Sequence, residues 1–244
     1  DPEGFWTARP DGEMVACMSL VRHDRAFAFI GFYIVHPDHR GRGIGLALWR
    51  FVTDRIDRRV TIRLDSVIEE ELTYRKAGFS RTHRSFRFGG IPDLSHAKRG
   101  SDDLVTIDAA QMAAIKAYDS DFFPSPREKF LNAWLSAPGH QGIAAVMDGD
   151  IRGYGVIRPC RDGHKIGPLF ADDPETAERL FCNLVEDSGA EKVYLDPPFA
   201  NDEALEMCER LGLQRVFETL RMYRGLAPQM RFPGMFAITT FELE

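Results

Sequence analysis

The sequence has few cysteines, and they are scattered. Of the 244 residues only four are cysteine, and no two of them have the C-x-x-C spacing of a zinc or redox motif. This argues against a disulfide framework and against structural zinc, so we expect no metal site and a reducing, cytoplasmic setting. The cysteines are Cys17, Cys160, Cys182 and Cys208.

Long apolar runs and excess positive charge are also missing. No run reaches the 18 apolar residues of a transmembrane helix, and no charged segment precedes a shorter run as in a signal peptide. Lysine and arginine number 31 against 37 aspartate and glutamate, a net charge of −6. We therefore expect neither a nucleic acid nor a membrane as partner.

What remains is an ordinary globular composition, with 44% hydrophobic and 28% charged residues, enough for one large domain or two of common size. Hydrophobic periodicity predicts α/β structure in the first third of the chain. The expected strands are Phe5–Arg9, Met14–Val21, Ala26–Val35, Val60–Leu64 and Phe79–Phe88. One helix is expected to begin at Gly43 and a second to cover Glu69–Ala77.

The same order of elements then repeats. Turn glycines Gly12 and Gly149 lie 137 positions apart, and helix-ending glycines Gly78 and Gly212 lie 134 apart. These offsets predict a duplicated domain: residues 1–90, a polar linker at 91–102, and residues 103–244. The second copy has 40 residues, Asp103 to Gly142, with no counterpart in the first, so we expect a strand and two helices to be missing before Asp1.

The second copy has its own predicted elements. We expect strands at Leu104–Ile107, Ile143–Met147, Ile151–Arg158, Lys165–Phe170, Lys192–Leu195 and Arg215–Tyr223, and helices at Ala109–Tyr118, Arg127–Leu135, Pro174–Gly189 and Asp202–Leu211.

The sharpest motif is a glycine-rich turn between a buried strand and an amphipathic helix. It contains Arg40, Gly41, Arg42, Gly43, Ile44 and Gly45. Such a turn leaves backbone N–H groups unpaired at the positive end of a helix, which suits phosphate or diphosphate. Simple turn chemistry is the alternative. A P-loop is excluded because no Lys-Ser or Lys-Thr follows, and a dinucleotide fold because antiparallel hairpins precede the strand.

In this context the turn resembles the R-x-x-G-x-G signature of the GCN5-related N-acetyltransferase (GNAT) superfamily. Val35-His36-Pro37 looks like the family's strand exit, and Leu72 to Phe79 resembles its L-Y-x-x-x-G-F segment with one extra residue. The resemblance implies two tandem GNAT folds, each a mixed, mostly antiparallel sheet flanked by helices.

The resemblance also implies a site. The amides of Arg40, Gly41, Arg42, Gly43, Ile44 and Gly45 would hold the diphosphate of acetyl-CoA, and the strand edge at Ile34 and Val35 would pair with its pantetheine arm. Tyr74 would be the general acid; the alternative is a half-buried aromatic. The general base stays open, because His23, Asp24 and Asp65 are the nearby candidates and Val67 replaces the family's asparagine.

In the second copy the signature is absent. Asp173 is predicted to cap the helix that begins at Pro174, which makes a good helix start and a poor phosphate site. This copy is similar to the degenerate C-terminal domain of tandem bacterial GNAT proteins. Four of its residues gather at a helix break: Asp119, Phe122, Phe123 and Arg127. They either line a substrate pocket or are solvated loop charges beside a pair of core phenylalanines.

We therefore expect an acyltransferase that moves an acetyl or acyl group from acetyl-CoA to an amine on a small molecule or a peptide. Monomer and homodimer both remain open. The alternatives are a non-catalytic acyl-CoA-binding or regulatory module and a scaffold that binds no coenzyme.

Overall fold

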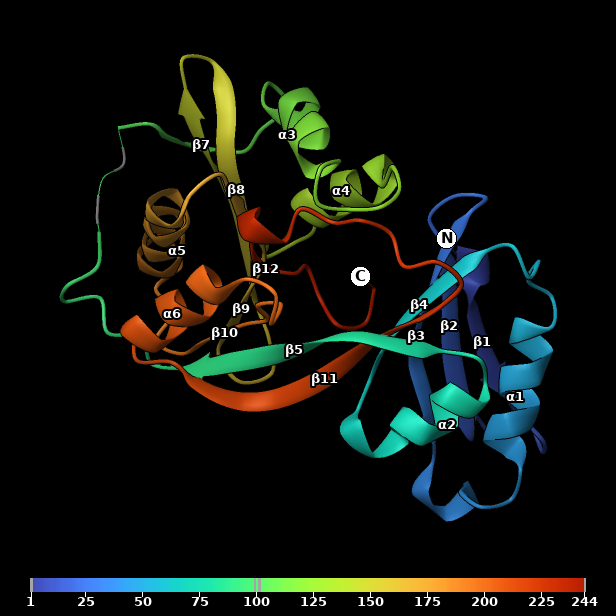
Figure 1. The fold of residues 1–244 in the computed structure, drawn as a ribbon. Helices are drawn as coiled ribbons and strands as arrows, with labels where there is room; N and C mark the ends of the chain where they lie inside the picture. Colours follow the sequence, from blue (N-terminus) through green and yellow to red (C-terminus); the bar gives the residue numbers. More distant parts are fainter. Residues whose placement is uncertain (1, 99, 101, 244) are drawn as a thin grey trace. The chain divides into compact units, whose positions relative to one another are not determined.

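The computed structural model of the chain describes residues 2–98, 100 and 102–243; Arg99 and Ser101 of the predicted linker lie outside the described residues. The chain forms two compact units (Figure 1). Unit 1 contains Asp1–Thr82, Leu220–Pro228 and Phe241–Glu244, and unit 2 contains His83–Thr219 and Gln229–Thr240.

Unit 1 is a sheet in the order β1-β2-β3-β4-β11 with α1 and α2 packed on it. Helix α1 packs on β1, β2 and β3, and its Leu48, Trp49 and Val52, at spacings of three to four residues, are buried in a core that also contains β2 side chains. The first elements of the chain are β1 (Phe5–Ala8), β2 (Ala16–Arg22), β3 (Phe27–Val35), η2 (Pro37–His39), α1 (Ile44–Thr53), β4 (Thr61–Ser66), η3 (Ile68–Glu70) and α2 (Glu71–Lys76). They are followed by β5 (Ser80–Gly90), which belongs to unit 2 from His83 on.

Unit 2 has the strand order β5-β10-β9-β8-β7-β6, with β12 added to β9. Its elements are β6 (Leu104–Thr106), α3 (Met112–Asp119), α4 (Glu128–Leu135), β7 (Gln141–Met147), β8 (Asp150–Pro159), β9 (His164–Ala171), α5 (Pro174–Ser188), β10 (Val193–Leu195), α6 (Asp202–Arg210), η4 (Phe232–Gly234) and β12 (Met235–Ala237). Strand β11 (Gln214–Arg224) begins in unit 2 and belongs to unit 1 from Leu220 on. Within the described ranges no helix is both long and apolar enough to cross a membrane.

The two units repeat one plan, which confirms the predicted tandem α/β fold. In each, antiparallel strands lead to one parallel pair, β3 with β4 and β9 with β10, and the second strand of that pair has an antiparallel strand on its other side. That last strand is exchanged between the halves of the sequence. Leu220–Arg224 of β11 pairs with β4, and Phe88–Gly90 of β5 pairs with β10.

The exchange also explains a difference from the sequence prediction. Strand β5 continues past Phe88 because Gly89 and Gly90 pair with Tyr194 and Val193 of β10. The ring of Tyr194 lies directly against Gly89, where a larger residue would clash with it. The predicted division at 1–90, 91–102 and 103–244 describes the two copies in the sequence. The compact units of the structure do not test these bounds, so the division stays a prediction.

A buried ion pair joins β4 to the exchanged strand β11. Arg221 donates from Nε and Nη2 to the two carboxylate oxygens of Asp65, both at 2.8 Å, and both side chains are 1% exposed. The two residues are also direct partners in the strand register. A bidentate pair shielded from water fixes both the register and the identity of the closing strand.

Replacing Arg221 with Met should strongly destabilise the protein, because it leaves the Asp65 carboxylate buried without its partner. We expect the free energy of unfolding to fall by about 3–5 kcal/mol. Chemical denaturation followed by circular dichroism measures this change. Arg59→Met, which removes only an exposed contact to Asp57, is the control and should cost far less. Equal losses in the two variants would contradict a structural role for the buried pair.

Candidate functional site

The glycine-rich turn after β3 adopts a backbone that only glycine takes without strain. Gly41 has φ +72° and Gly43 has φ +78°, and Gly43 is the N-cap of α1. A Cβ atom added to either residue would meet no protein atom within 4 Å. The absence of side chains therefore serves the backbone conformation and leaves the space in front of the turn open.

Most amides of this turn have no hydrogen-bond acceptor in the described part of the chain. Arg40 N–H donates to the Pro37 carbonyl at 3.2 Å, and Ala47 N–H donates to the Gly43 carbonyl at 2.9 Å. Between them, the amides of residues 41–46 have no hydrogen-bond acceptor among the described residues. Exposed N–H groups at a helix N-terminus, with the positive end of the helix dipole, form a cradle for an anion.

The two arginines of the turn have different contacts. Arg40 Nε donates to the carbonyl of Val35 at 3.1 Å and so fixes the exit from β3. Arg42 Nη1 lies 3.3 Å from His39 Nδ1. Both arginines are exposed, so the turn combines backbone donors with positive side chains.

Beside the turn, β3 separates from β4. The two strands pair only from Phe27 opposite Thr61 to Ile30 opposite Leu64. Phe32 then has φ +49°, and a bulge shifts the register with β2. Ile34 and Val35 keep partners on β2 alone, so in the described part of the chain their other edge is unpaired. The structure thus brings the open edge of Ile34 and Val35 next to the anion cradle.

Tyr74 lies on α2 in an aromatic cluster. Its ring centroid is 5.5 Å from that of Trp49, which is also 5.5 Å from Tyr33 of β3. Burial, followed by the charges of Tyr33 and Glu70, raises the pKa of Tyr74 well above that of an ordinary phenol. Tyr74 therefore keeps its proton at neutral pH and can act as a hydrogen-bond donor.

Tyr33 is a site residue that the sequence analysis missed. Together with Tyr74, it lines a cavity of about 550 Å³ between α1 and α2. Its hydroxyl lies so near Gly45 that a Cβ atom added there would be only 2.8 Å from it. Burial and Glu70 raise its pKa as well. The available signal was its position two residues before Val35, on the same face of the strand.

The structure places the three candidate bases in other roles. Asp65 is bound by Arg221 in the buried pair. Asp24 accepts from the amides of Ala26 and Phe27 at 2.6 and 2.7 Å and so shapes a hairpin turn. His23 packs against Phe27 with 5.9 Å between ring centroids. Both carboxylates are thus engaged in structural contacts.

Comparison with known proteins places this geometry in a family. The description "Acetyltransferase (GNAT) family" matches residues 1–79, and "Acetyltransferase (GNAT) domain" matches residues 115–236. A holothin acyltransferase of Pseudoalteromonas sp. (strain SANK 73390) is 30% identical over 244 residues, which is 100% of this chain and 82% of the relative. The chain belongs to the GNAT acetyltransferase family.

Other relatives agree with a GNAT protein. The uncharacterized N-acetyltransferase YitH of Bacillus subtilis is 24% identical over 173 residues, 71% of this chain and 61% of the relative. A structure from Pyrococcus horikoshii superposes with a TM-score of 0.85 at 24% identity, covering 100% of this chain and 81% of the other. A tandem GNAT protein from the clavulanic acid biosynthesis pathway gives 0.66 at 15% identity, covering 92% and 83%.

The second unit of this GNAT protein fills the corresponding notch with its own chain. Beyond the pairing of Ile166 with Leu195, β9 and β10 separate. There β12 pairs with Leu169 and Phe170 of β9, and Ile238 N–H donates to the Asp196 carbonyl at 3.0 Å. A strand of the protein thus occupies the edge that stays open in unit 1.

The helix start of unit 2 is also closed. Asp173 caps α5 by accepting from Thr176 N–H at 2.8 Å, and Pro174 stands in the first turn. The predicted cap is therefore confirmed. Its carboxylate places negative charge where unit 1 offers open donors.

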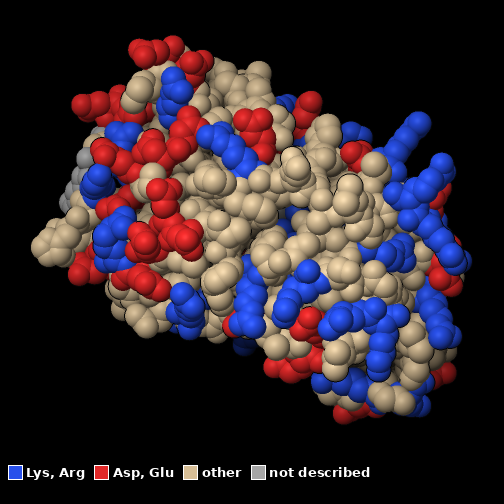
Figure 2. Space-filling model, viewed as in Figure 1, with Lys and Arg blue, Asp and Glu red and all other residues tan. Residues whose placement is uncertain are grey.

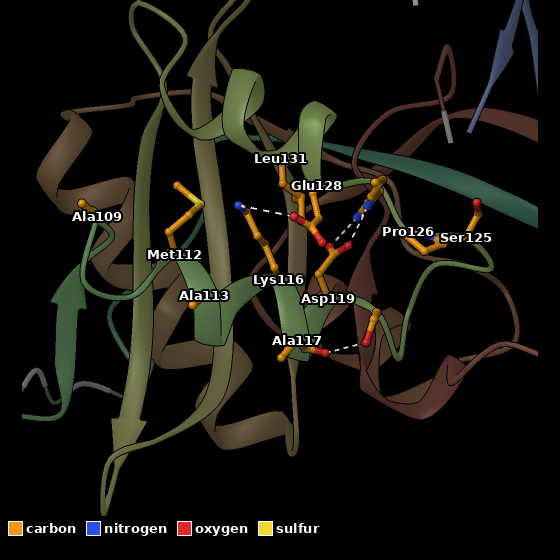
Figure 3. A pocket seen from close by; sticks show the side chains of 12 residues that line it. Ala109, Met112, Ala113, Lys116, Ala117, Asp119, Ser125, Pro126, Glu128 and Leu131 are labelled. Carbon is orange, nitrogen blue, oxygen red and sulfur yellow. Dashed lines mark hydrogen bonds and ion pairs between the residues drawn. The ribbon is translucent and has the colours of Figure 1, made fainter. Parts of the chain in front are cut away.

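Two of the four residues at the helix break in unit 2, Asp119 and Arg127, line a cavity of about 650 Å³ (Figure 3). Asp119 and Arg127 are buried and form a bidentate pair, while Phe122 stacks on Phe170, so none of these is solvated loop charge. Tyr154 also donates to Asp119. The buried charges in this cavity thus balance each other. Among the described residues no group of three or more potential ligands could hold a metal ion.

A change at Gly43 should separate the cradle from ordinary turn chemistry. Gly43→Ala strains the backbone at φ +78°, by about 1–2 kcal/mol, and Gly43→Glu adds negative charge to the cradle. We expect weakened acetyl-CoA binding in the first and none in the second, measured by isothermal titration. The control is Gly12→Ala, at φ +85° in a hairpin turn with equally open space; a similar loss of binding in this control would contradict the cradle.

The closed notch of unit 2 predicts a stoichiometry. Acetyl-CoA should saturate the protein at one equivalent per chain, because in the described residues the notch beside β3 in unit 1 is open, whereas β12 fills the corresponding notch beside β9 in unit 2. Native mass spectrometry of the protein with excess acetyl-CoA measures the ratio directly. Two bound equivalents at low ligand concentration would show that β12 does not close the second notch.

Proposed function

We propose that unit 1 binds acetyl-CoA or another acyl-CoA and transfers the acyl group to a primary amine by direct attack. The observation that carries the proposal is the run of unbonded amides at residues 41–46 beside the open strand edge of β3. Membership of the GNAT family and the relative named a holothin acyltransferase support acyl transfer.

The residues present fit a coenzyme of this chemistry. A diphosphate needs several convergent N–H donors, and the turn from Gly41 to Gly45 offers them at a helix N-terminus. The pantetheine arm carries amide groups, which are suited to the open edge of Ile34 and Val35 in the manner of an added strand. Bound there, the coenzyme would supply the acyl group as a thioester.

The backbone and side-chain groups around this site then have separate tasks. Val35 N–H is the proposed donor to the carbonyl oxygen under attack, where negative charge develops. The Tyr74 hydroxyl keeps its proton and is the proposed donor to the departing sulfur. Tyr33, whose hydroxyl lies beside Gly45, is proposed to position the coenzyme rather than to move a proton.

The acceptor is proposed to be an amine on a small molecule or a peptide. A net charge of −6 favours encounter with a cationic amine over an anionic acceptor. Attack itself requires the neutral amine, because the lone pair forms the new bond to the acyl carbon. The new N–C bond forms as the C–S bond breaks; the nitrogen gives its proton to solvent, Tyr74 gives its own to the departing thiolate, and solvent returns a proton to Tyr74.

Two conservative substitutions test this division of tasks. Tyr74→Phe should lower kcat by about 100-fold or more with little change in KM, because it removes the proton donor. Tyr33→Phe should raise KM for acetyl-CoA and leave kcat nearly unchanged. Thiol release across a panel of amines, amino acids and peptides gives both constants. Tyr194→Phe, whose hydroxyl contacts Asp162 in unit 2, is the control and should have no effect.

The pH dependence adds a second readout. Because the pKa of Tyr74 lies above that of an ordinary phenol, its protonated form persists as pH rises, and its loss should not lower the rate below about pH 10. Unchanged turnover in Tyr74→Phe would remove Tyr74 from the mechanism. Acetyl-CoA binding without thiol release for any amine would favour a non-catalytic binding module.

A further inference from the structure

Three consecutive glutamates follow β4 beside the proposed acyl-transfer site. Glu69 and Glu70 end η3, and Glu71 begins α2. Figure 2 shows acidic side chains gathered over η3 and α2, beside lysine and arginine side chains. Because β3 and β4 run parallel, their C-terminal ends lie at one edge of the sheet. The glutamates therefore follow the β4 side of the notch, and Ile34 and Val35 form its β3 side.

The helix dipole accounts for acidic residues at this helix start, but not for the contacts of each carboxylate. Glu71 lies 3.6 Å from Arg81 in a surface ion pair. Glu70 is the N-cap of α2, yet its side chain accepts no hydrogen bond from the helix. In the described ranges it also has no hydrogen bond or ion pair with another side chain. The Glu70 carboxylate is therefore available to a bound substrate.

Glu70 lies beside the two tyrosines of the site. It stands four residues before Tyr74, so the two side chains are neighbours on one face of α2. Burial is the main cause of the raised pKa of Tyr33 and Tyr74, and the charge of Glu70 adds to it in both. Glu69 and Glu71 have no such effect on either tyrosine. Since a surface charge is largely screened beyond about 10 Å in dilute salt, the Glu70 carboxylate lies near both hydroxyls.

We propose that Glu70 takes the proton from the attacking amine and returns it to Tyr74. This inference rests on the proposed acyl transfer and replaces solvent in both of its proton transfers. The nitrogen lone pair forms the N–C bond, and the Glu70 carboxylate removes a proton from the positively charged nitrogen. As the C–S bond breaks, the Tyr74 hydroxyl gives its proton to the sulfur. The Glu70 carboxylic acid then protonates the Tyr74 phenolate, so that one proton has moved from nitrogen to sulfur and both residues are restored.

The acid strengths of the two groups set the direction of the last step. Carboxylic acids are far stronger acids than phenols, so a proton on Glu70 moves to the Tyr74 phenolate rather than the reverse. The burial of Tyr74 strengthens this preference, because it disfavours the phenolate further. Asp65 and Asp24 cannot take this role, since their carboxylates are engaged by Arg221 and by hairpin amides.

Glu70→Gln tests the proposal, because the amide keeps the size of the side chain and cannot take the proton. Thiol release is measured with acetyl-CoA and the amine of the panel that reacts fastest. The substitution should lower kcat by about 100-fold with little change in KM for acetyl-CoA. Glu69→Gln is the matched control, since it removes the same charge from the same helix start, and kcat should stay nearly unchanged. Both residues are exposed, and circular dichroism checks that both variants fold.

Two further readouts separate proton transfer from an effect of charge alone. Formate should restore part of the rate in Glu70→Ala, because it supplies the missing carboxylate, and it should not accelerate Glu69→Ala. The double variant Tyr74→Phe with Glu70→Gln should be at most about threefold slower than the slower single variant, because residues of one proton path act as a unit.

The outcomes separate this inference from the proposed function. Equal kcat values in Glu70→Gln and Glu69→Gln would overturn the role of Glu70 and leave acyl transfer intact. Losses that multiply in the double variant, to about 10⁴-fold, would mean that the two residues act independently and would overturn the return of the proton to Tyr74. If the unmodified protein released no thiol with any amine, the proposed function would fail, and the proton path with it.

Discussion

Backbone N–H groups at the start of a helix need acceptors, and the protein meets this need differently in its two units. At α1, Gly41 and Gly43 keep the space in front of the amides open, so an external anion can supply the acceptors. At α5, the Asp173 carboxylate supplies one internally. One position in a duplicated fold thus becomes a ligand site in one copy and a closed helix start in the other.

The strand edges follow the same division. β3 and β9 both separate from their parallel neighbours, which exposes main-chain groups inside a sheet. In unit 2, β12 pairs with the exposed edge, whereas in unit 1 Ile34 and Val35 stay open on that side in the described part of the chain. Because the halves exchange their closing strands, each sheet depends on both halves of the sequence, and the buried Asp65–Arg221 pair reinforces one of those exchanges.

Local patterns were sufficient to predict most of the elements and the glycine-rich turn. The strand from Phe27 to Val35, α1 and the Asp173 cap follow from periodicity and turn chemistry, which depend on neighbouring residues. Long-range pairings left no such signal. Four features join residues distant in sequence. They are the exchange of β5 and β11, the pairing of β12 with β9, the ion pair of Asp65 with Arg221, and the close approach of Tyr33 to Gly45. The roles of Tyr74 and the turn residues in catalysis and binding stay predictions.

Hydrogen–deuterium exchange with and without acetyl-CoA tests the central claim most directly, because it reports on individual backbone amides. The account predicts that acetyl-CoA slows exchange at the amides of residues 41–46 and leaves the start of α5 around Thr176 unchanged. Unaltered exchange at residues 41–46 under saturating acetyl-CoA, or protection at α5 instead, would contradict it.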